Sequence, residues 1–396
     1  MTKLPEEGVF KKVKQYICAK CRTVSIIPHD HGQESGNLIA EIDDTILLAA
    51  NKQIESERRQ VGADGLVGGL NHLIINTEQS KHIAAAEELM STTGLRFSDA
   101  FEDKSHNFII LTTDNSADFM ITSRKDGINP FLPFNQAPKS KHLPNTRLET
   151  LVFRSPDLEK YVSIQKNRGV RFMTDRIIER RNCLFIQTVP SLFTGNSIGF
   201  IQWTGTKGDY RTQKSKSLRL EVNKPLSRPL SQIKYLDHIA TRVEAKIRDK
   251  AIIEFMELTN YSFDFAIYIK KLNSITSVTR LTKNDFTLVF TSGISKDIKE
   301  EYAGPTEQYV RNYGVRAHHM AFHTEDIDNV FHELKKGGVE FLSDLVGSPD
   351  EGLKQAFTVG SPNTFLVNEY IHRFGDFDGF FTKSNVEILT KATEKQ

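Results

Sequence analysis

The 396-residue sequence predicts an α+β fold, in which four βαβββ modules form two open β-barrels and a C-terminal helix covers the second barrel. Two observations carry this prediction. The chain contains an internal repeat, and within each copy an apolar strand pattern is followed by a helix and several further strands, twice over. A third observation, a set of metal-competent side chains in the second copy, indicates which barrel carries out chemistry.

The repeat appears as a constant offset between two stretches of sequence. Residues 148–175 correspond to residues 317–344 with an offset of 169 (319 minus 150, 338 minus 169 and 344 minus 175). Two shorter segments match in the same way, and they place His72 opposite His238 and Gln202 opposite Glu369. The two halves are therefore predicted to be copies of one domain.

Each half is expected to contain strands and helices in the same order. Proline is tolerated at the first helical turn and glycine readily ends a helix, so Pro156 and the pair Gly337-Gly338 mark helix boundaries. The first half should hold strands near 70–76 and 147–153 and helices near 80–91 and 157–168. The second half should hold strands near 234–240 and 316–323, helices near 243–258 and 325–336, and a last helix near 383–393.

The repeat also divides the chain into parts. Residues 1–68 precede it as an extension of unknown role, 69–206 form the first barrel, 207–231 connect the barrels, and 232–396 form the second barrel with its covering helix. Within the extension, the polar stretch that runs from Asn51 to a group of glycines is typical of a linker.

Two cysteines and two histidines stand out in the extension. Cys18 and Cys21 are followed by His29 and His31, and such residues can form a Cys2His2 zinc site. The spacing does not match the usual one, and no second cysteine pair follows. A zinc site, a redox pair and an ordinary surface appendage are the alternatives, of which the appendage is preferred.

Composition argues against several classes of function. The 52 Lys and Arg residues nearly balance 50 Asp and Glu residues, for a net charge of +2, so there is no electrostatic case for nucleic-acid binding. No apolar run approaches the roughly 18 residues of a membrane span, and the first residues lack an apolar signal core. Three cysteines form no disulfide framework, so a cytoplasmic location is expected.

Three side chains on predicted strands of the second copy suit a metal ion. His238, His319 and Glu369 would supply two imidazoles and one carboxylate, the facial triad of non-haem Fe(II) oxygenases. Of the adjacent pair His318 and His319, His319 aligns with the inward Thr150, and neighbours on a strand face opposite ways. We therefore expect one Fe(II) per chain, with His318 supporting a ligand.

The first copy lacks this set of ligands. It carries His72, Thr150 and Gln202 at the positions that the repeat makes equivalent. Threonine and a neutral glutamine do not supply the imidazole and the anionic oxygen that hold a divalent iron. The first barrel is therefore expected to be a metal-free scaffold.

The ligand motifs resemble those of a known family. Asp-His at 237–238, His-His-Met-Ala at 318–321 and Glu-Tyr-Ile-His-Arg at 369–373 are similar to the Asp-His, Gln-His-(Ile/Leu)-Ala and Glu-Ile-Ile-Gln-Arg motifs of the 4-hydroxyphenylpyruvate dioxygenase family, in the vicinal oxygen chelate superfamily. The resemblance covers roughly residues 69–396 and is clearest in the second half. It implies the two-barrel fold of that superfamily and an aryl 2-oxo acid and O2 as substrates.

Further motifs imply contacts to the substrate. Gln-Ala-Phe-Thr at 355–358 resembles the family's Gln-Ile-Phe-Thr, and the segment 378–385 resembles the family motif that opens the C-terminal helix. The chain departs from the family where Asn-Glu-Pro is replaced by Ser-Gly-Ile at 292–294, and where the glutamine before the second ligand is replaced by histidine. The resemblance implies substrate contacts from Gln355, Phe357, Phe380, Ser277, Asn385 and Ser292.

The activity that the resemblance implies is conversion of 4-hydroxyphenylpyruvate and O2 to homogentisate and CO2, a step of tyrosine catabolism. Synthesis of 4-hydroxymandelate from the same substrate is the alternative within the family. A ligand-binding protein of the same fold is the non-enzymatic alternative, and zinc-type hydrolysis has no support beyond the ligand set. Assembly into a dimer or tetramer is left open.

Overall fold

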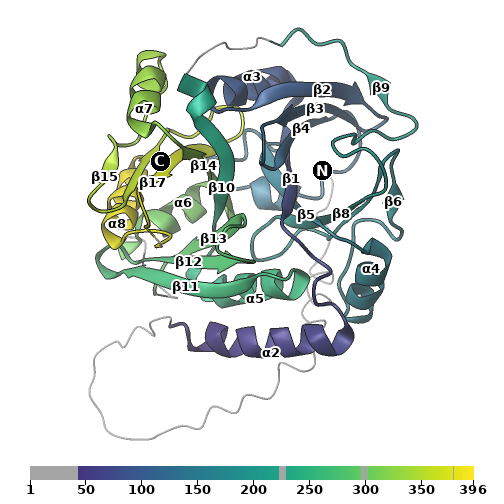
Figure 1. Cartoon of the computed structure of the whole chain (residues 1–396), viewed down its shortest axis with the longest axis horizontal. Coiled ribbons are helices and arrows are strands. Elements are labelled where there is room, and N and C mark those ends of the chain that lie inside the picture. The colour runs from purple at the N-terminus through teal and green to yellow at the C-terminus, as the bar shows by residue number, and fades with distance from the viewer. Residues whose placement is uncertain (1–42, 223–228, 296–298, 300–301, 378) are drawn as a thin grey trace, which may run out of the picture. The chain divides into compact units, whose positions relative to one another are not determined.

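Two β-sheets make up most of the described chain (Figure 1). The computed structural model describes residues 43–222, 229–295, 299, 302–377 and 379–396. The first half forms a nine-stranded sheet in the order β6-β7-β8-β5-β1-β4-β3-β2-β9, and the second half an eight-stranded sheet in the order β11-β12-β13-β10-β14-β17-β16-β15. The predicted α+β fold with two open barrels is confirmed.

The elements of the first half follow the expected order. Its helices are α3 (His82–Thr92) and α4 (Leu158–Asn167), with short 3-10 turns at Gln79–Lys81 and Leu132–Asn135. Its strands are β1 (Leu70–Thr77), β2 (Arg96–Glu102), β3 (His106–Thr112), β4 (Asp118–Arg124), β5 (Arg147–Arg154), β6 (Ile178–Glu179), β7 (Cys183–Gln187), β8 (Ser197–Trp203) and β9 (Lys216–Ser217).

The second half repeats this order with one additional helix between its modules. Its helices are α5 (Arg248–Leu258), α6 (Pro305–Tyr313), α7 (Ile327–Lys336) and α8 (Lys383–Ala392), with 3-10 turns at Pro229–Gln232, Ala245–Ile247, Lys270–Leu272 and Thr393–Lys395. Its strands are β10 (Ile233–Arg242), β11 (Ser262–Ile269), β12 (Ser274–Arg280), β13 (Thr287–Ser292), β14 (Arg316–Thr324), β15 (Val346–Ser348), β16 (Leu353–Phe357) and β17 (Val367–Arg373).

Strand pairing shows that the two sheets are copies of one another. β1 pairs in parallel with β4 and antiparallel with β5, and β10 pairs in the same way with β13 and β14. Opposite His72 on β5 lies Val152, and opposite His238 on β14 lies Ala321. His72 and His238 are therefore equivalent, as the repeat predicted.

The sequence alignment of Gln202 with Glu369 is wrong. Glu369 lies opposite Ala321, whereas in the first sheet the residue opposite the equivalent Val152 is Gly199. The counterpart of Glu369 is thus Gly199 and not Gln202. Gln202 has a local role instead, because its side-chain oxygen accepts a hydrogen bond of 2.7 Å from the backbone N–H of Leu158, at the start of α4.

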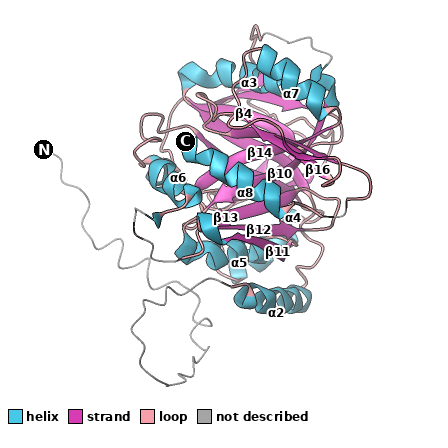
Figure 2. Cartoon of the chain, turned by 90° about the vertical axis from the view of Figure 1, so that its left-hand side faces the viewer, coloured by secondary structure: helices cyan, strands magenta, loops and turns pink. Residues whose placement is uncertain are grey.

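Helices lie against the outer faces of the sheets (Figure 2). Aromatic side chains join these layers. On α4, Tyr161 packs against Phe200 of β8 with ring centroids 4.2 Å apart. On α5, Phe255 packs against Phe290 of β13 with centroids 5.9 Å apart. Helix α8 contacts β15 and β16, and its buried side chains face the interior of the second barrel.

The end of the N-terminal extension is helical. Residues expected to form a linker lie instead in α2 (Thr45–Val61), which packs on α5 and β11. Asn51 and Arg58 fix this helix by donating side-chain hydrogen bonds to the backbone carbonyls of Phe263 and Tyr261, at 2.6 and 2.9 Å. Few apolar residues mark α2 in the sequence, so these distant contacts explain why its pattern was missed. Cys18, Cys21, His29 and His31 lie outside the described residues.

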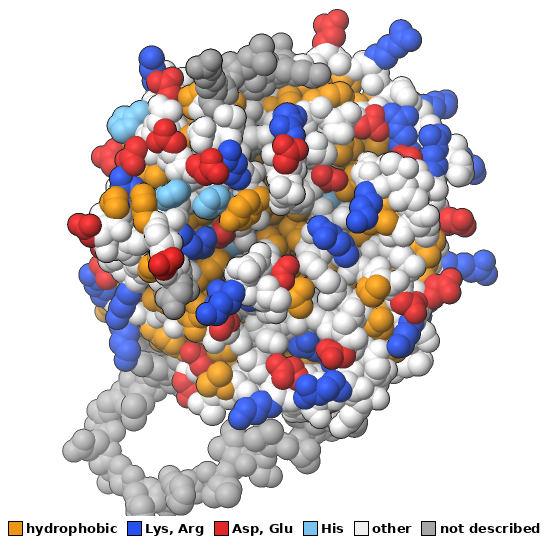
Figure 3. Space-filling model, in the orientation of Figure 1, with side chains coloured by type: hydrophobic (Ala, Val, Ile, Leu, Met, Phe, Trp, Pro, Cys, Tyr) orange, Lys and Arg blue, Asp and Glu red, His pale blue; other side chains and the backbone are white. Residues whose placement is uncertain are grey.

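Part of the expected connector, 207–231, also packs on the first sheet. Lys216–Ser217 adds strand β9 to β2, and the side chain of Tyr210 is buried inside the first barrel. The described part of the chain contains no helix long and apolar enough to cross a bilayer. On the face drawn in Figure 3, basic and acidic side chains are intermixed, in keeping with the balanced charge.

Candidate metal centre

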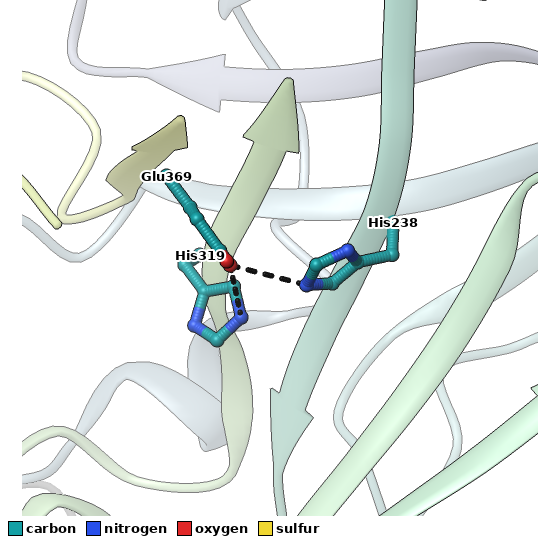
Figure 4. Close-up of side chains that lie close together, drawn as sticks. All are labelled: His238, His319 and Glu369. Carbon is teal, nitrogen blue, oxygen red and sulfur yellow. Dashed lines mark ion pairs between the residues drawn. The ribbon is translucent and has the colours of Figure 1, made fainter. Parts of the chain in front are cut away.

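Three neighbouring strands of the second sheet bring the predicted ligands together (Figure 4). His238 comes from β10, His319 from β14 and Glu369 from β17. The Glu369 Oε2 atom lies 3.1 Å from Nε2 of His238 and 3.3 Å from Nε2 of His319. Within the part of the chain that is described, this is the one group of three or more His, Cys, Asp or Glu side chains placed to share a metal ion.

The donor atoms of this group fit a cation. His238 is fully buried and Glu369 is 1% exposed, yet Nε2 of His238 and Oε2 of Glu369 have no hydrogen-bond partner among the described residues. Buried polar atoms of this kind are normally satisfied. A metal ion between two imidazole nitrogens and a carboxylate oxygen would satisfy both, and the donor set suits divalent iron.

Each ligand is held by a further polar contact. Nδ1 of His238 lies 2.8 Å from Oδ2 of Asp237, and Arg373 donates two hydrogen bonds to the Asp237 carboxylate. This contact places the Nδ1 proton toward Asp237 and leaves Nε2 for the metal. Oε1 of Glu369 accepts a hydrogen bond of 2.5 Å from Gln355, whose own oxygen accepts one of 3.0 Å from Asn385.

His319 is supported from the C-terminal end of the chain. Its Nδ1 lies 2.8 Å from Nδ1 of His318, and Nε2 of His318 lies 2.7 Å from the side-chain oxygen of Gln396. Because each ring nitrogen of His318 has a partner, that residue orients His319 rather than offering a free donor atom. The structure thus places His318 against His319, and its role in supporting a metal ligand stays a prediction.

The charges of the site act differently on its two imidazoles. Burial lowers the pKa of His238, but the carboxylates of Glu369 and Asp237 outweigh burial and raise that pKa to about 9. Burial, together with His318 and His238, holds the pKa of His319 well below its usual range. The two carboxylates therefore favour a positive charge at this point, which a bound cation would supply in place of a proton.

A narrow cavity of about 50 Å³ adjoins the ligands. That volume has room for a few water molecules. The second sheet supplies most of the wall, and α8 closes it with Val386, Leu389 and Thr390. The other residues that line the cavity are Arg242, Thr276, Val289, Thr291, Thr306, His319, Gln355, Phe357, Glu369 and Phe381.

Solved structures share this architecture. A triple mutant of 4-hydroxymandelate synthase from Streptomyces coelicolor matches with a TM-score of 0.62 and 15% identity, over 83% of this chain and 98% of its own. The chain has the vicinal oxygen chelate fold. A xylose isomerase-like TIM barrel/4-hydroxyphenylpyruvate dioxygenase fusion protein matches with a TM-score of 0.60 and 13% identity, over 88% of this chain and 57% of its own, so this chain spans little more than half of it. No family model and no curated protein matches the sequence.

In this vicinal oxygen chelate fold, some of the expected substrate contacts lie at the cavity. Gln355 and Phe357 line it, and the ring of Phe357 lies 4.7 Å from that of His319. Asn385 is fully buried at the start of α8 and reaches the site through Gln355.

Phe380 and Phe381 both lie beside His238, with ring centroids 5.4 and 5.2 Å from its imidazole. Phe381 lines the cavity, and Phe380 also packs against the guanidinium groups of Arg373 and Arg280. Ser277 faces α5, where its hydroxyl accepts a hydrogen bond from buried Arg248.

Ser292 is fully buried, and its hydroxyl donates to the neighbouring carbonyl of Gly293. On β12 and β13 the side chains at the cavity are Thr276, Val289 and Thr291. Since successive strand residues face opposite sides, a slip of one position in a motif alignment moves a contact to the wrong face.

Proposed function

We propose that the chain is an Fe(II)-dependent dioxygenase that converts 4-hydroxyphenylpyruvate and O2 to homogentisate and CO2. The observation that carries the proposal is the convergence of His238, His319 and Glu369 on one point, with unsatisfied buried donor atoms, beside a cavity with aromatic walls. A bound Fe(II) would supply the electrons that activate O2 for oxidation of the 2-oxo acid.

The residues of the chain position the reactants. Asp237 and Gln355 fix the orientation of His238 and Glu369, so the ligand geometry exists before substrate binds. Phe357 and Phe381 offer apolar faces for a flat ring. Val386 and Leu389 on α8 exclude water from the reacting atoms, which protects a reactive oxidant from side reactions.

The small cavity has a consequence for substrate entry. Pockets for small molecules usually measure about 300–1,000 Å³, well above the 50 Å³ found beside the triad. An aryl 2-oxo acid therefore enters only if side chains of α8 move away from the sheet. This behaviour is expected of a closing element that controls access in enzymes.

The decisive experiment is anaerobic reconstitution with Fe(II), followed by addition of O2 and 4-hydroxyphenylpyruvate. The proposal expects O2 consumption matched by CO2 release, with homogentisate as the product. A 4-hydroxymandelate product would favour the second family activity, which the likeness to the synthase also supports. Substrate binding without any O2 consumption in the iron-loaded protein would favour a ligand-binding protein of the same fold.

A further inference from the structure

A buried arginine faces the cavity from the strand that carries the first metal ligand. Arg242 is the last residue of β10, four positions after His238, so both side chains lie on the same face of the strand. At about 3.3 Å per residue, the two positions are roughly 13 Å apart along the strand. Arg242 is 4% exposed and lines the cavity together with His319 and Glu369.

This guanidinium has no counter-ion among the described residues. Its two hydrogen bonds go to the carbonyl of Pro305 at 3.3 Å and the hydroxyl of Thr393 at 3.0 Å, and it stacks 4.5 Å above the ring of Tyr309. Buried Arg248 forms ion pairs with two aspartates, whereas buried Arg147 and Arg316, like Arg242, bond to neutral groups; of these three, Arg242 is the one that lines the cavity. An arginine side chain carries five N–H donors. Two hydrogen bonds do not use all of them, so Arg242 keeps N–H groups that can bind a ligand.

A second unused polar group lies beside it. Thr291 on β13 is the register partner of Arg242, and its hydroxyl is buried without a hydrogen-bond partner. Thr306 also lines the cavity. We call Arg242, Thr291 and Thr306 the cationic end of the cavity. Val289, Phe357, Phe381, Val386 and Leu389 supply its apolar lining, and His319, Gln355 and Glu369 its metal end.

We propose that Arg242 and Thr291 bind a carboxylate of the substrate at the end of the cavity away from His238. The preferred substrate is then an aryl 2-oxo acid with a carboxylate on its ring in place of the neutral hydroxyl of 4-hydroxyphenylpyruvate, an inference that rests on the proposed dioxygenase chemistry and changes its substrate. A charge buried without a partner is costly, whereas charge-assisted hydrogen bonds to a carboxylate compensate it. Burial lowers the pKa of Arg242 to about 10, so the guanidinium remains charged near neutral pH.

The test compares three ligands that differ at one ring position. Phenylpyruvate, 4-hydroxyphenylpyruvate and 4-carboxyphenylpyruvate are titrated anaerobically by calorimetry into the Fe(II)-loaded protein, and O2 uptake is then measured with each. The wild-type chain should bind the 4-carboxy compound about tenfold or more tightly than phenylpyruvate, from the usual strength of hydrogen bonds to charged groups. Arg242→Met should abolish this preference and leave phenylpyruvate binding nearly unchanged.

Three further variants separate a direct role from a structural one. Arg242→Lys keeps the charge and should retain part of the preference, and Thr291→Val should lower it without abolishing it. Arg96→Met, which removes an exposed arginine paired with Asp114, should change nothing. If Arg242→Met does not fold, the Lys and Val variants decide, and an unchanged ligand ratio in both would overturn the proposal.

The remaining outcomes distinguish this inference from the proposed function. Equal loss of affinity for all three ligands in Arg242→Met would mean that the arginine contacts the shared 2-oxo acid group, and would overturn the inference. O2 uptake with no dependence on Arg242 would leave the dioxygenase standing and refute the cationic end. Arg242-dependent binding of the 4-carboxy compound without O2 uptake would support the cationic end and refute the dioxygenase.

Discussion

The two barrels place an equivalent histidine inside the same strand framework, but they surround it differently. In the first barrel, Nδ1 of His72 lies 2.8 Å from the neutral side chain of Asn71, and the ring of Tyr210 lies 4.7 Å away. In the second barrel, the same contact of His238 is made by Asp237, a carboxylate paired with Arg373. The register of the strands is kept while the charge that prepares the histidine for a metal is present in one copy only.

The side chains inside the two barrels also differ. The first barrel is filled by an apolar cluster that includes Phe185, Met120 and Tyr210, and burial holds the pKa of His72 well below its usual range. Thr150 and Gly199 stand where the second barrel has His319 and Glu369. The comparison teaches that the shared strand framework and its histidine do not by themselves make a group that could hold a metal: among the described residues, the second barrel alone adds two further metal-competent side chains, a charged support and a cavity beside them.

Loss of the anionic ligand, Glu369, should have the largest effect on Fe(II) affinity. Glu369→Gln removes the carboxylate but keeps the shape, so Fe(II) affinity should fall by more than the roughly 10–100-fold that loss of a supporting residue costs. His72→Gln in the first barrel is the matched control and should leave metal content unchanged. Iron analysis after gel filtration, with melting temperature as the folding check, measures both. Full iron retention in Glu369→Gln would refute the triad.

Replacing the charged neighbour of His238 by a neutral one, as His72 has, should have the next largest effect on Fe(II) affinity. Asp237→Asn gives His238 the neutral neighbour that His72 has, so Fe(II) affinity should fall by about 10–100-fold while the three ligands remain. Competition with a chelator of known affinity gives the ratio. If the affinity does not change, the difference between Asn71 and Asp237 has no bearing on metal binding.

The adjacent aromatic residues Phe380 and Phe381 should separate scaffold from pocket. Phe380 is 8% exposed and packs on Arg373, so Phe380→Ala should cost about 3–5 kcal/mol of stability. Phe381 lines the cavity, so Phe381→Ala should chiefly lower the product formed per O2 consumed, because the ring loses its near-attack position. Melting temperature and coupling efficiency are measured on both variants. The reverse pattern would return Phe380 to the cavity wall.

The differences between the sequence predictions and the structure show which features can be predicted from sequence. The repeat and the three ligands are visible because they follow local strand patterns, and the structure brings those ligands together. Gly199 was missed because the sequence alignment paired Glu369 with Gln202, an offset of 167, whereas the strand register gives an offset of 170 (369 minus 199). Ser277 and Ser292 were each one residue from a cavity position, and on a strand one residue reverses the face. Arg242 was visible four positions after His238, but its lack of a counter-ion depends on the tertiary fold.

A final comparison concerns two contacts between the halves. The hydroxyl of Ser191, in the loop between β7 and β8, donates to Glu254 of α5, and the hydroxyl of Ser361, in the loop between β16 and β17, donates to Glu88 of α3 at 2.7 Å. The two contacts are related by the repeat. Glu88 also accepts a hydrogen bond of 2.7 Å from Asn363.

Above neutral pH, Glu254 should stabilise the folded state less than Glu88 does. Burial raises its pKa to about 7, so its neutral form is favoured in the folded state, and this contribution to stability is lost as pH rises from about 4.5 through 7. Glu254→Gln stays neutral, so it should match the wild type at pH 5 and exceed it by roughly 1–3 kcal/mol at pH 8. Glu88→Gln is the control and should give no such gain, because a carboxylate that accepts two hydrogen bonds would be replaced by a weaker acceptor. Urea unfolding at both pH values measures the difference. An equal gain from both variants would show a general relief of negative charge, and the two contacts would then be equivalent in energy as well as in position.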